Sequence, residues 1–270
     1  MSKRILIVPD TQVRPGEPTQ HLRWVGYSIK RYEPDIVVHL GDHWDMHSLS
    51  FWNSKKEQEG ARVSKDIEAG NTALQLLEDS MEGYKPKRKI LLRGNHEYRL
   101  QKFLDSDPKL EGSIGFDQFN DKELGWEVVD YFHGSPKAIE VEGIQFAHYF
   151  ANPMTGKPIG GTINNRLAKI GSSFVQGHQQ GLLQGNVQYA TGVTRHGIVS
   201  GSCYLHDESY KGMANTHWRG IVVLNEVRNG TFCEMPLTLD YLCREYEGVS
   251  LKRYMNKNFK RAKERFTLAN

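Results

Sequence analysis

Cysteine is scarce in this chain, and the three present follow neither metal-site nor disulfide-framework spacing: Cys203, Cys233 and Cys243. Long apolar runs are also missing, since none approaches the ~20 residues that a membrane-spanning helix needs. The apolar run at residues 5–8 is too short for the core of a signal peptide, and no small-residue cleavage site follows it. We therefore expect a protein of the reducing cytoplasm that has no membrane association.

A strong net charge is absent as well, because the formal charge is only +3 over 270 residues. Its distribution is uneven: residues 250–270 carry +6, which leaves −3 for residues 1–249. Apolar residues in the C-terminal stretch fall on one helical stripe: Leu251, Met255, Phe259, Ala262 and Phe266. The basic residues lie mostly elsewhere around that helix, which is typical of an amphipathic helix with a cationic outer face. We therefore expect a main domain over 1–249 and a basic amphipathic helix over 250–270.

The apolar patterning of the first hundred residues predicts alternating strands and helices. They follow in this order: strand 3–9, helix 20–32, strand 35–40, helix 62–82 and strand 88–93. A β-α-β order implies parallel strands joined by right-handed crossovers. After residue 182 the pattern changes to short strands and turns, with an Asn-Gly hairpin signal at 229–230. We predict one α/β domain with a parallel first half and a strand-rich second half.

Five apolar runs end directly in polar side chains of the kinds that bind metals. Strand by strand these residues are Asp10 and Gln12; Asp42 and Asp45; Asn95 and His96; His148; and His178 and Gln180. Glycines precede three of the groups, at Gly41, Gly94 and Gly177, and glycine lets the backbone turn sharply where a side chain would clash. Open α/β sheets bind ligands at the carboxyl ends of their strands. We therefore expect these side chains to converge on one site.

This mixture of oxygen and imidazole donors predicts a metal centre. Carboxylate and amide oxygens suit hard ions such as Mg²⁺ and Mn²⁺, whereas imidazole suits borderline ions such as Zn²⁺ and Fe²⁺. One aspartate at a strand end would be ordinary, and one histidine on a strand is more often a core residue. Five such positions in one chain point to metal binding. Two ions roughly 3.5–4 Å apart can activate a water and clamp the oxygens of a phosphoryl group.

Over residues 10–180 the ordered motifs resemble those of the calcineurin-like metallophosphoesterases. The chain has Asp-x-Gln, Gly-Asp-x-x-Asp, Gly-Asn-His-Glu, His and Gly-His-x-Gln. The family usually has Asp-x-His, Gly-Asp-x-x-Asp, Gly-Asn-His-Asp/Glu, His and Gly-His-x-His. The resemblance implies a four-layer α/β/β/α sandwich of two mixed sheets flanked by helices. It also implies a metal-dependent phosphoric ester hydrolase with a dinuclear site at the strand ends.

The resemblance further implies seven metal ligands. Asp42 would bridge two divalent ions, for which Mn²⁺ is the expected metal and Mg²⁺, Zn²⁺ or Fe are alternatives. The remaining ligands divide between the two ions: Asp10, Gln12 and Gln180 at one, and Asn95, His148 and His178 at the other.

Catalytic roles fall on residues close to these ligands. By the same resemblance, His96 would lie beside the phosphate and help with leaving-group protonation or charge stabilisation. Asp45 would be the partner that orients a histidine. Arg99 is the third catalytic candidate, because it is available to the phosphate. Arg93 is equally available, and either arginine could instead form a surface ion pair.

Gln12 and Gln180 stand where the family has histidines, and by the resemblance both belong to the same ion. A glutamine can coordinate through its amide oxygen, but it is a weaker donor than imidazole toward borderline metals. We hypothesise that this site holds Mn²⁺ or Mg²⁺ loosely, or fills only when the substrate adds phosphate oxygens. The alternative is a chain that binds one metal. His43 and His47 could substitute as ligands, although ordinary loop histidines are the plainer interpretation.

The sequence leaves the phosphate-ester substrate open. Residues 91–97 are locally similar to the serine/threonine protein phosphatases. Those enzymes usually continue their second motif with Asp-Arg-Gly, where this chain has Asp45, Met46 and His47. That departure, together with the two glutamines, argues against this branch of the family.

A nuclease is an alternative that the basic helix suggests. Clustered Lys and Arg on one helix face are typical of contact with a nucleic-acid backbone, and Tyr254 or Phe266 could stack on a base. A helix that packs on the domain by its apolar stripe and leaves its basic face in solvent would have the same sequence pattern. A further alternative is a non-catalytic metal- or nucleic-acid-binding protein on this fold, although such a protein has no need of His96. A compact domain of this kind would suit a bacterial protein or a viral protein in the host cytoplasm.

Overall fold

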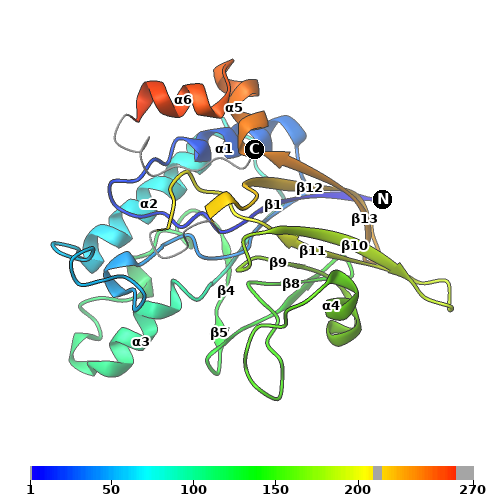
Figure 1. The fold of residues 1–270 in the computed structure, drawn as a ribbon, viewed down its shortest axis with the longest axis horizontal. Helices are drawn as coiled ribbons and strands as arrows, with labels where there is room; N and C mark the ends of the chain where they lie inside the picture. Colours follow the sequence, from blue (N-terminus) through cyan, green and yellow to red (C-terminus); the bar gives the residue numbers. More distant parts are fainter. Residues whose placement is uncertain (1, 209–214, 260–270) are drawn as a thin grey trace.

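Two mixed β-sheets pack face to face, and helices cover the outer face of each (Figure 1). The structure is a computed structural model, and it describes residues 2–208 and 215–259. The first four strands of the chain belong to the first sheet, later strands form the second sheet, and the last two strands belong to the first sheet again. No helix in the described ranges is both long and apolar enough to cross a membrane.

The first sheet has six strands in the order β13-β12-β1-β2-β3-β4. Their bounds are β1 Lys3–Val8, β2 Ile36–His39, β3 Arg88–Leu92, β4 Glu127–Val129, β12 Gly220–Arg228 and β13 Thr231–Thr238. β1 to β4 run parallel, as the β-α-β pattern predicts, and β12 adds to β1 in the antiparallel direction. β12 and β13 form the hairpin that Asn229 and Gly230 indicate in the sequence.

The second sheet has five strands in the order β10-β11-β9-β8-β7. Their bounds are β7 Ile139–Val141, β8 Ile144–Ala147, β9 Ser173–Gln176, β10 Leu182–Gln188 and β11 Thr194–Ser200. β8, β9 and β11 are parallel, whereas the edge strands β7 and β10 are antiparallel to their neighbours. A separate two-stranded ribbon consists of β5 (Tyr131–Phe132) and β6 (Ser135–Pro136).

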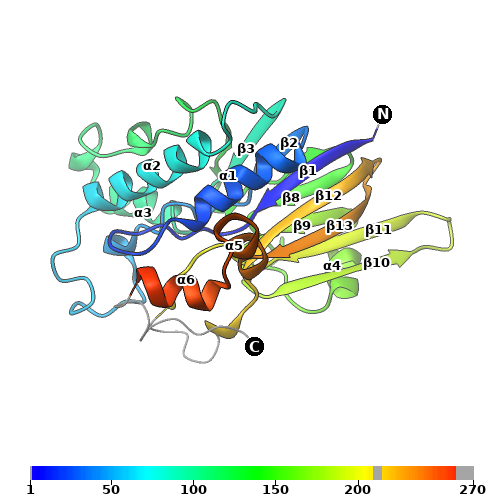
Figure 2. The ribbon, with the colours of Figure 1, turned by 90° about the horizontal axis from the view of Figure 1, so that it is seen from above.

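The helices form the two outer layers (Figure 2). Those on the side of the first sheet are α1 His21–Tyr32, α2 Val63–Asp79, α3 Tyr98–Ser106, α5 Leu239–Glu247 and α6 Leu251–Asn258. The second sheet is covered by α4 (Ile163–Ile170). Short 3₁₀ turns lie in the connections: η1 His47–Leu49, η2 Pro108–Leu110 and η3 Phe116–Gln118.

Side-chain alternation along β1 shows how the layers are assembled. Leu6 and Val8 are buried against the helices of the first outer layer. Ile5 and Ile7 point to the opposite face and are buried between the two sheets. Successive strand residues face opposite sides, so a strand buried on both faces must be apolar throughout. The predicted four-layer α/β/β/α sandwich is thereby confirmed.

Helix α5 was not predicted from the sequence. Thr238 caps its first turn by accepting a hydrogen bond from the backbone N–H of Tyr241, and Gly248 ends it at φ 70°. Leu239 and Leu242 are buried among the residues of the first outer layer. The cap residue, the i, i+3 apolar spacing and the terminal glycine are therefore the signals that could have found this helix.

Helix α6 begins the predicted basic helix and packs on the body of the protein. Leu251 and Met255 are buried, and the ring of Tyr254 meets Trp24 edge-on with the centroids 5.2 Å apart. Lys252, Arg253 and Lys257 are exposed on its outer side. Residues 260–270, which include the predicted stripe positions Ala262 and Phe266, lie outside the described residues.

Candidate metal centre

The carboxyl ends of strands from both sheets meet at one edge of the sandwich. β1 leads to Asp10, β2 to Asp42 and β3 to Asn95 in the first sheet, while β8 leads to His148 and β9 to His178 in the second. Parallel strands that point the same way deliver their following residues to the same edge. The convergence expected from the sequence is therefore what the topology produces.

Two glycines let these loops approach closely enough to share a site. A Cβ on Gly94 would lie 2.0 Å from Oδ1 of Asp42, and a Cβ on Gly177 would lie 2.4 Å from Oδ1 of Asp10. Both distances are far below van der Waals contact, so any larger residue would displace an aspartate. The glycines thus allow close packing of the loops that carry the predicted ligands.

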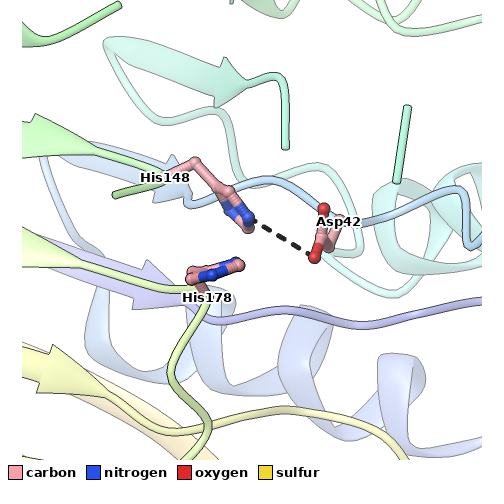
Figure 3. A group of neighbouring side chains, drawn as sticks. All are labelled: Asp42, His148 and His178. Atoms are coloured by element: carbon pink, nitrogen blue, oxygen red, sulfur yellow. Dashed lines mark ion pairs between the residues drawn. The ribbon is translucent and has the colours of Figure 1, made fainter. Parts of the chain in front are cut away.

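Asp42, His148 and His178 place one ligand atom each within 4.8 Å of one another, and their side chains point toward a common centre (Figure 3). Nε2 of His148 lies 3.4 Å from Oδ2 of Asp42. The side-chain oxygen of Asn95 reaches the same centre, 2.9 Å from Nε2 of His148 and 2.7 Å from Nδ1 of His178. Four of the predicted ligands are therefore mutual neighbours.

The hydrogen bonding of His148 shows that this group fits a cation. Its Nδ1 lies 2.8 Å from the carbonyl oxygen of Leu40, which can only accept, so Nδ1 carries the proton. Burial lowers the pKa of His148, so the ring is neutral and Nε2 presents a lone pair. That lone pair faces a carboxylate and an amide oxygen, which are also acceptors. A positive ion among these three acceptors satisfies all of them, and the bond to Leu40 fixes the ring as in many metal sites.

Three predicted ligands have backbones in the left-handed region: Gln12 (φ 40°), Asp42 (φ 50°) and His178 (φ 63°). Such conformations are uncommon for residues with a side chain, and they gather at functional sites. Burial alone would raise the pKa of Asp42, but the nearby His148 and His96 lower it. Asp42 is therefore ionised, and its left-handed backbone is of the kind that gathers at functional sites.

His96 and Asp45 form a buried pair beside this centre. Nδ1 of His96 lies 2.6 Å from Oδ1 of Asp45, and Nε2 lies 3.6 Å from Oδ2 of Asp42. Burial alone would raise the pKa of Asp45, but the hydrogen bond from His96 holds it well below its usual range. Arg99 donates from Nη1 to the backbone oxygen of Asp45 at 2.8 Å. All three predicted catalytic residues are therefore in one connected group.

An ion-pair network that the sequence did not indicate continues from Asp45. Nη1 of Arg14 lies 3.5 Å from Oδ2 of Asp45 and 3.2 Å from Oε2 of Glu208. Glu208 in turn pairs with His206 at 3.2 Å, and this partner offsets burial and lowers the pKa of Glu208 to about 2. Arg14 and Glu208 are 194 positions apart in the chain, and neither lies in a recognisable motif.

The two glutamines make different contacts. Gln12 is buried, its backbone N–H donates to the carbonyl oxygen of Asp42 at 2.7 Å, and its Oε1 has no hydrogen-bond partner among the described residues. Gln180 accepts a 2.6 Å hydrogen bond from the hydroxyl of Tyr204. Asp10 is tied to the centre through both carboxylate oxygens, which accept the backbone N–H of His178 at 3.1 and 3.2 Å. A buried amide oxygen without a donor, as in Gln12, suits a cation.

Glu97 joins the loops that carry the ligands. Its carboxylate accepts four backbone N–H bonds, from Asp42, His43, Trp44 and Gly94, at distances between 2.5 and 3.0 Å. The last residue of the Gly-Asn-His-Glu motif is thus a positioning residue for two loops. Burial, with the nearby charge of Asp42, raises the pKa of Glu97 to about 7.

Three other candidates make contacts with residues that are not predicted ligands. Arg93 is buried and pairs with Asp121 at 2.5 Å, so its ion pair is a buried one and not a surface one. Burial lowers the pKa of His43 to about 4, and its Nε2 bonds to the carbonyl oxygen of Gly70 at 2.9 Å. His47 is half-buried in η1, with Nε2 3.5 Å from the carbonyl oxygen of Glu57.

A cluster of carboxylate, amide and imidazole groups at the strand ends of an α/β/β/α sandwich is typical of metal-dependent hydrolases. Comparison with protein families agrees, because the model of the calcineurin-like phosphoesterases matches residues 3–171. The chain therefore belongs to the calcineurin-like phosphoesterase family. That family implies divalent metal ions, and the group of Asp42, His148 and His178 is where the chain offers them ligands.

Two curated phage proteins are similar to this chain. The Gene 54 protein of Mycobacterium phage D29 is 30% identical over 193 residues, which covers 66% of this chain and 69% of the phage protein. The Gene 54 protein of Mycobacterium phage L5 is 30% identical over 185 residues, with the same coverage. Their names state no activity. A solved crystal structure covers 87% of this chain and 99% of its own at 12% identity and a TM-score of 0.40, a likeness too distant to bear on function.

Proposed function

We propose that this protein hydrolyses a phosphate ester with a water activated at a dinuclear metal site. The observation that carries the proposal is that Nε2 of His148 presents a lone pair to two further acceptors, the side-chain oxygens of Asp42 and Asn95. When bound, the ions would supply positive charge to the phosphoryl oxygens and ease deprotonation of the attacking water. A binding protein without catalysis would need the ligands but not the buried His96–Asp45 pair beside them.

The residues of the chain divide this work between them. Asp42 would bridge the ions, with Asn95, His148 and His178 at one ion and Asp10, Gln12 and Gln180 at the other. His96, oriented by Asp45, would hold its Nε2 toward the phosphate and pass a proton to the leaving oxygen. Arg99 would bind a phosphoryl oxygen, since its position is fixed by the carbonyl of Asp45.

Manganese is the ion we propose for the glutamine-containing site. The amide oxygens of Gln12 and Gln180 are hard donors, which favour Mn²⁺ or Mg²⁺ over Zn²⁺. The unpartnered Oε1 of Gln12 supports its role as a ligand. We expect this ion to bind more weakly than the ion held by His148 and His178.

The alternative substrate is a nucleic-acid phosphodiester. The observation that favours it is the exposure of Lys252, Arg253 and Lys257 on the outer side of α6. Such a cationic face could contact a phosphate backbone. We also propose a location in the host cytoplasm, which the phage origin of the two relatives and the three free cysteines support.

The test is hydrolysis of an aryl phosphodiester and an aryl phosphomonoester by protein stripped of metal and then given Mn²⁺, Mg²⁺, Zn²⁺ or Ni²⁺. Restored turnover that is lost in Asp42→Asn supports a phosphoesterase that depends on this centre. Asp117→Asn, at an exposed aspartate in η3, is the matched control and should remain active. The ratio of diester to monoester rates then separates nuclease-like from phosphatase-like activity. Folded protein without turnover under every metal would overturn the proposal in favour of a binding protein.

A further inference from the structure

A cavity of about 350 Å³ opens directly beside the candidate metal centre. Asn95 lines both, so a molecule in the cavity can place one end among the predicted metal ligands. Arg99 and Lys102 line it as well, and they project from one face of α3 because they are three residues apart. Phe51 and Trp52 line another part of the cavity. Its volume is at the lower end of the range for small-molecule sites.

The two aromatic rings of this cavity are unusual for their exposure. Phe51 is 92% exposed and Trp52 is 71% exposed, whereas most aromatic rings of a folded domain are packed in its core. Their centroids lie 6.0 Å apart with the rings at 85°, so each presents a face in a different direction. Rings this exposed contribute little to the fold, and their apolar faces remain available to another molecule.

The loop that carries these rings is held by its own hydrogen bonds. Nε2 of Gln58 donates to the carbonyl oxygens of Ser50, at 2.6 Å, and of His47, at 3.1 Å. The backbone N–H of Ser48 donates to Asp66 of α2 at 2.9 Å. These bonds fix the base of the loop to itself and to the first outer layer, so Phe51 and Trp52 extend from a defined support.

We propose that this cavity binds a nucleotide unit of the phosphate-ester substrate, with its base stacked on Phe51 or Trp52. The phosphate would then lie between the cations Arg99 and Lys102 and the metal centre at Asn95. Aromatic rings stack on any base because every base has a π-face, and Arg and Lys attract the phosphate. A sugar phosphate or a phosphoserine supplies the anion but leaves both rings exposed. The inference rests on the proposed phosphoesterase activity and adds the class of substrate.

The experiment compares substrates that differ only in the base. We would measure kcat/KM for thymidine 5′-phosphate against deoxyribose 5-phosphate, and for a trinucleotide against the same trinucleotide with one abasic position. The variants are Phe51→Ala, Trp52→Ala and Trp52→Phe, with Tyr241→Ala on α5 as a control at a partly exposed ring far along the chain. Tryptophan fluorescence during titration with thymidine 5′-phosphate gives a binding readout that needs no turnover.

We expect a preference of about tenfold or more for the base-bearing member of a pair, the factor that corresponds to one base stack. Phe51→Ala or Trp52→Ala should remove that preference, Trp52→Phe should keep part of it, and Tyr241→Ala should keep all of it. A preference in the thymidine 5′-phosphate pair indicates a free nucleotide, and a preference in the trinucleotide pair alone indicates a strand. Either result supports the nucleotide site.

Two results would overturn the inference while the proposed activity stands. One is turnover of base-bearing and base-free esters at equal rates, unchanged in Phe51→Ala and Trp52→Ala. The other is an equal effect of these variants on phenyl phosphate, which would show a site for any aromatic ring. Failure of the proposed activity looks different, because no ester would then be hydrolysed. In that case fluorescence quenching that is lost in Trp52→Ala would still support a nucleotide site, and its absence would reject it.

Discussion

His96 is held between two aspartates, with Nδ1 2.6 Å from Oδ1 of Asp45 and Nε2 3.6 Å from Oδ2 of Asp42. The short bond fixes the ring, and the low pKa of Asp45 keeps that partner ionised. Asp45→Asn removes the charge but preserves the shape. We expect kcat to fall about a hundredfold or more while KM changes little, since proton transfer by a positioned residue contributes roughly 10²–10⁴. Steady-state kinetics with a phosphate ester would show this.

The control for Asp45→Asn is Asp117→Asn, which also removes one negative charge but at an exposed site. Metal content should be measured for both variants, because Asp45 is not a predicted ligand. A drop in kcat that is matched by loss of metal would contradict a role in orienting His96.

Arg14 lies between two buried carboxylates, Asp45 and Glu208. Arg14→Met leaves both without this cation, and breaking such a buried pair typically costs about 3–5 kcal/mol of unfolding free energy. We expect a loss near the lower value in urea unfolding, because Glu208 keeps His206 as a second partner. The double variant Arg14→Met/Glu208→Gln should lose less than the two single losses combined. Additive losses would show that Arg14 and Glu208 are not coupled.

Gln12 and Gln180 can be tested by counting bound metal. If both are ligands, we expect the unaltered protein to bind two ions per chain and Gln12→Ala/Gln180→Ala to bind one, as measured by elemental analysis after dialysis against Mn²⁺. Gln12→His/Gln180→His should instead raise the affinity for Zn²⁺ about tenfold or more, because imidazole suits borderline metals. Gln75→Ala, on α2, is the control. Unchanged metal content in the double alanine variant would remove both glutamines from the ligand set.

Gly94 is the position where the approach of the ligand loops can be probed directly. A Cβ there would meet Oδ1 of Asp42 at 2.0 Å, so Gly94→Ala should lower the unfolding free energy by about 1–3 kcal/mol and weaken metal binding. Gly185→Ala is the matched control, because its Cβ would meet Ile163 at an ordinary 3.5 Å. We expect the control to stay within about 0.5 kcal/mol of the original protein. Equal melting temperatures for the two variants would contradict the close approach of Gly94 to Asp42.

The lowered pKa of His21 should make the unfolding free energy depend on pH. Burial lowers its pKa from 6.5 to about 3, so between these values the unfolded chain binds a proton that the folded chain does not. The unfolding free energy should therefore fall as the pH is lowered from about 6.5 toward 3, by up to ~1.4 kcal/mol per unit from this group. His43, with a pKa of about 4, acts in the same direction. Urea unfolding at pH 7 and pH 5 should show a smaller change for His21→Asn, and parallel changes would contradict the role of His21.

Much of the site was predictable because it depends on local rules. An apolar strand followed by glycine and polar residues places those residues at the strand's carboxyl end, and parallel strands share that edge. Asp42, Asn95, His148 and His178 could therefore be grouped before their distances were known. The parallel first half and the strand-rich second half were predictable because apolar periodicity separates strands from helices, and the resemblance to the calcineurin-like family supplied the four layers. Helix α5 was missed although its cap at Thr238 and its terminal Gly248 are local signals.

Other features of the candidate site depend on contacts between distant segments, which no local sequence pattern indicates. Arg93 and Arg99 look alike in the sequence, yet one is buried against Asp121 and the other lines the cavity beside Asn95. Arg14 meets Glu208 across 194 positions, a distance over which residue spacing carries no information.

The sequence by itself therefore determined the strand ends and the donor types of the candidate metal centre, because these follow from periodicity and from residue chemistry, whereas the four layers were implied by the family resemblance. Tertiary structure alone decided which charges are paired and which rings are exposed. Partners and burial are properties of surfaces that form only when remote segments of the chain pack together.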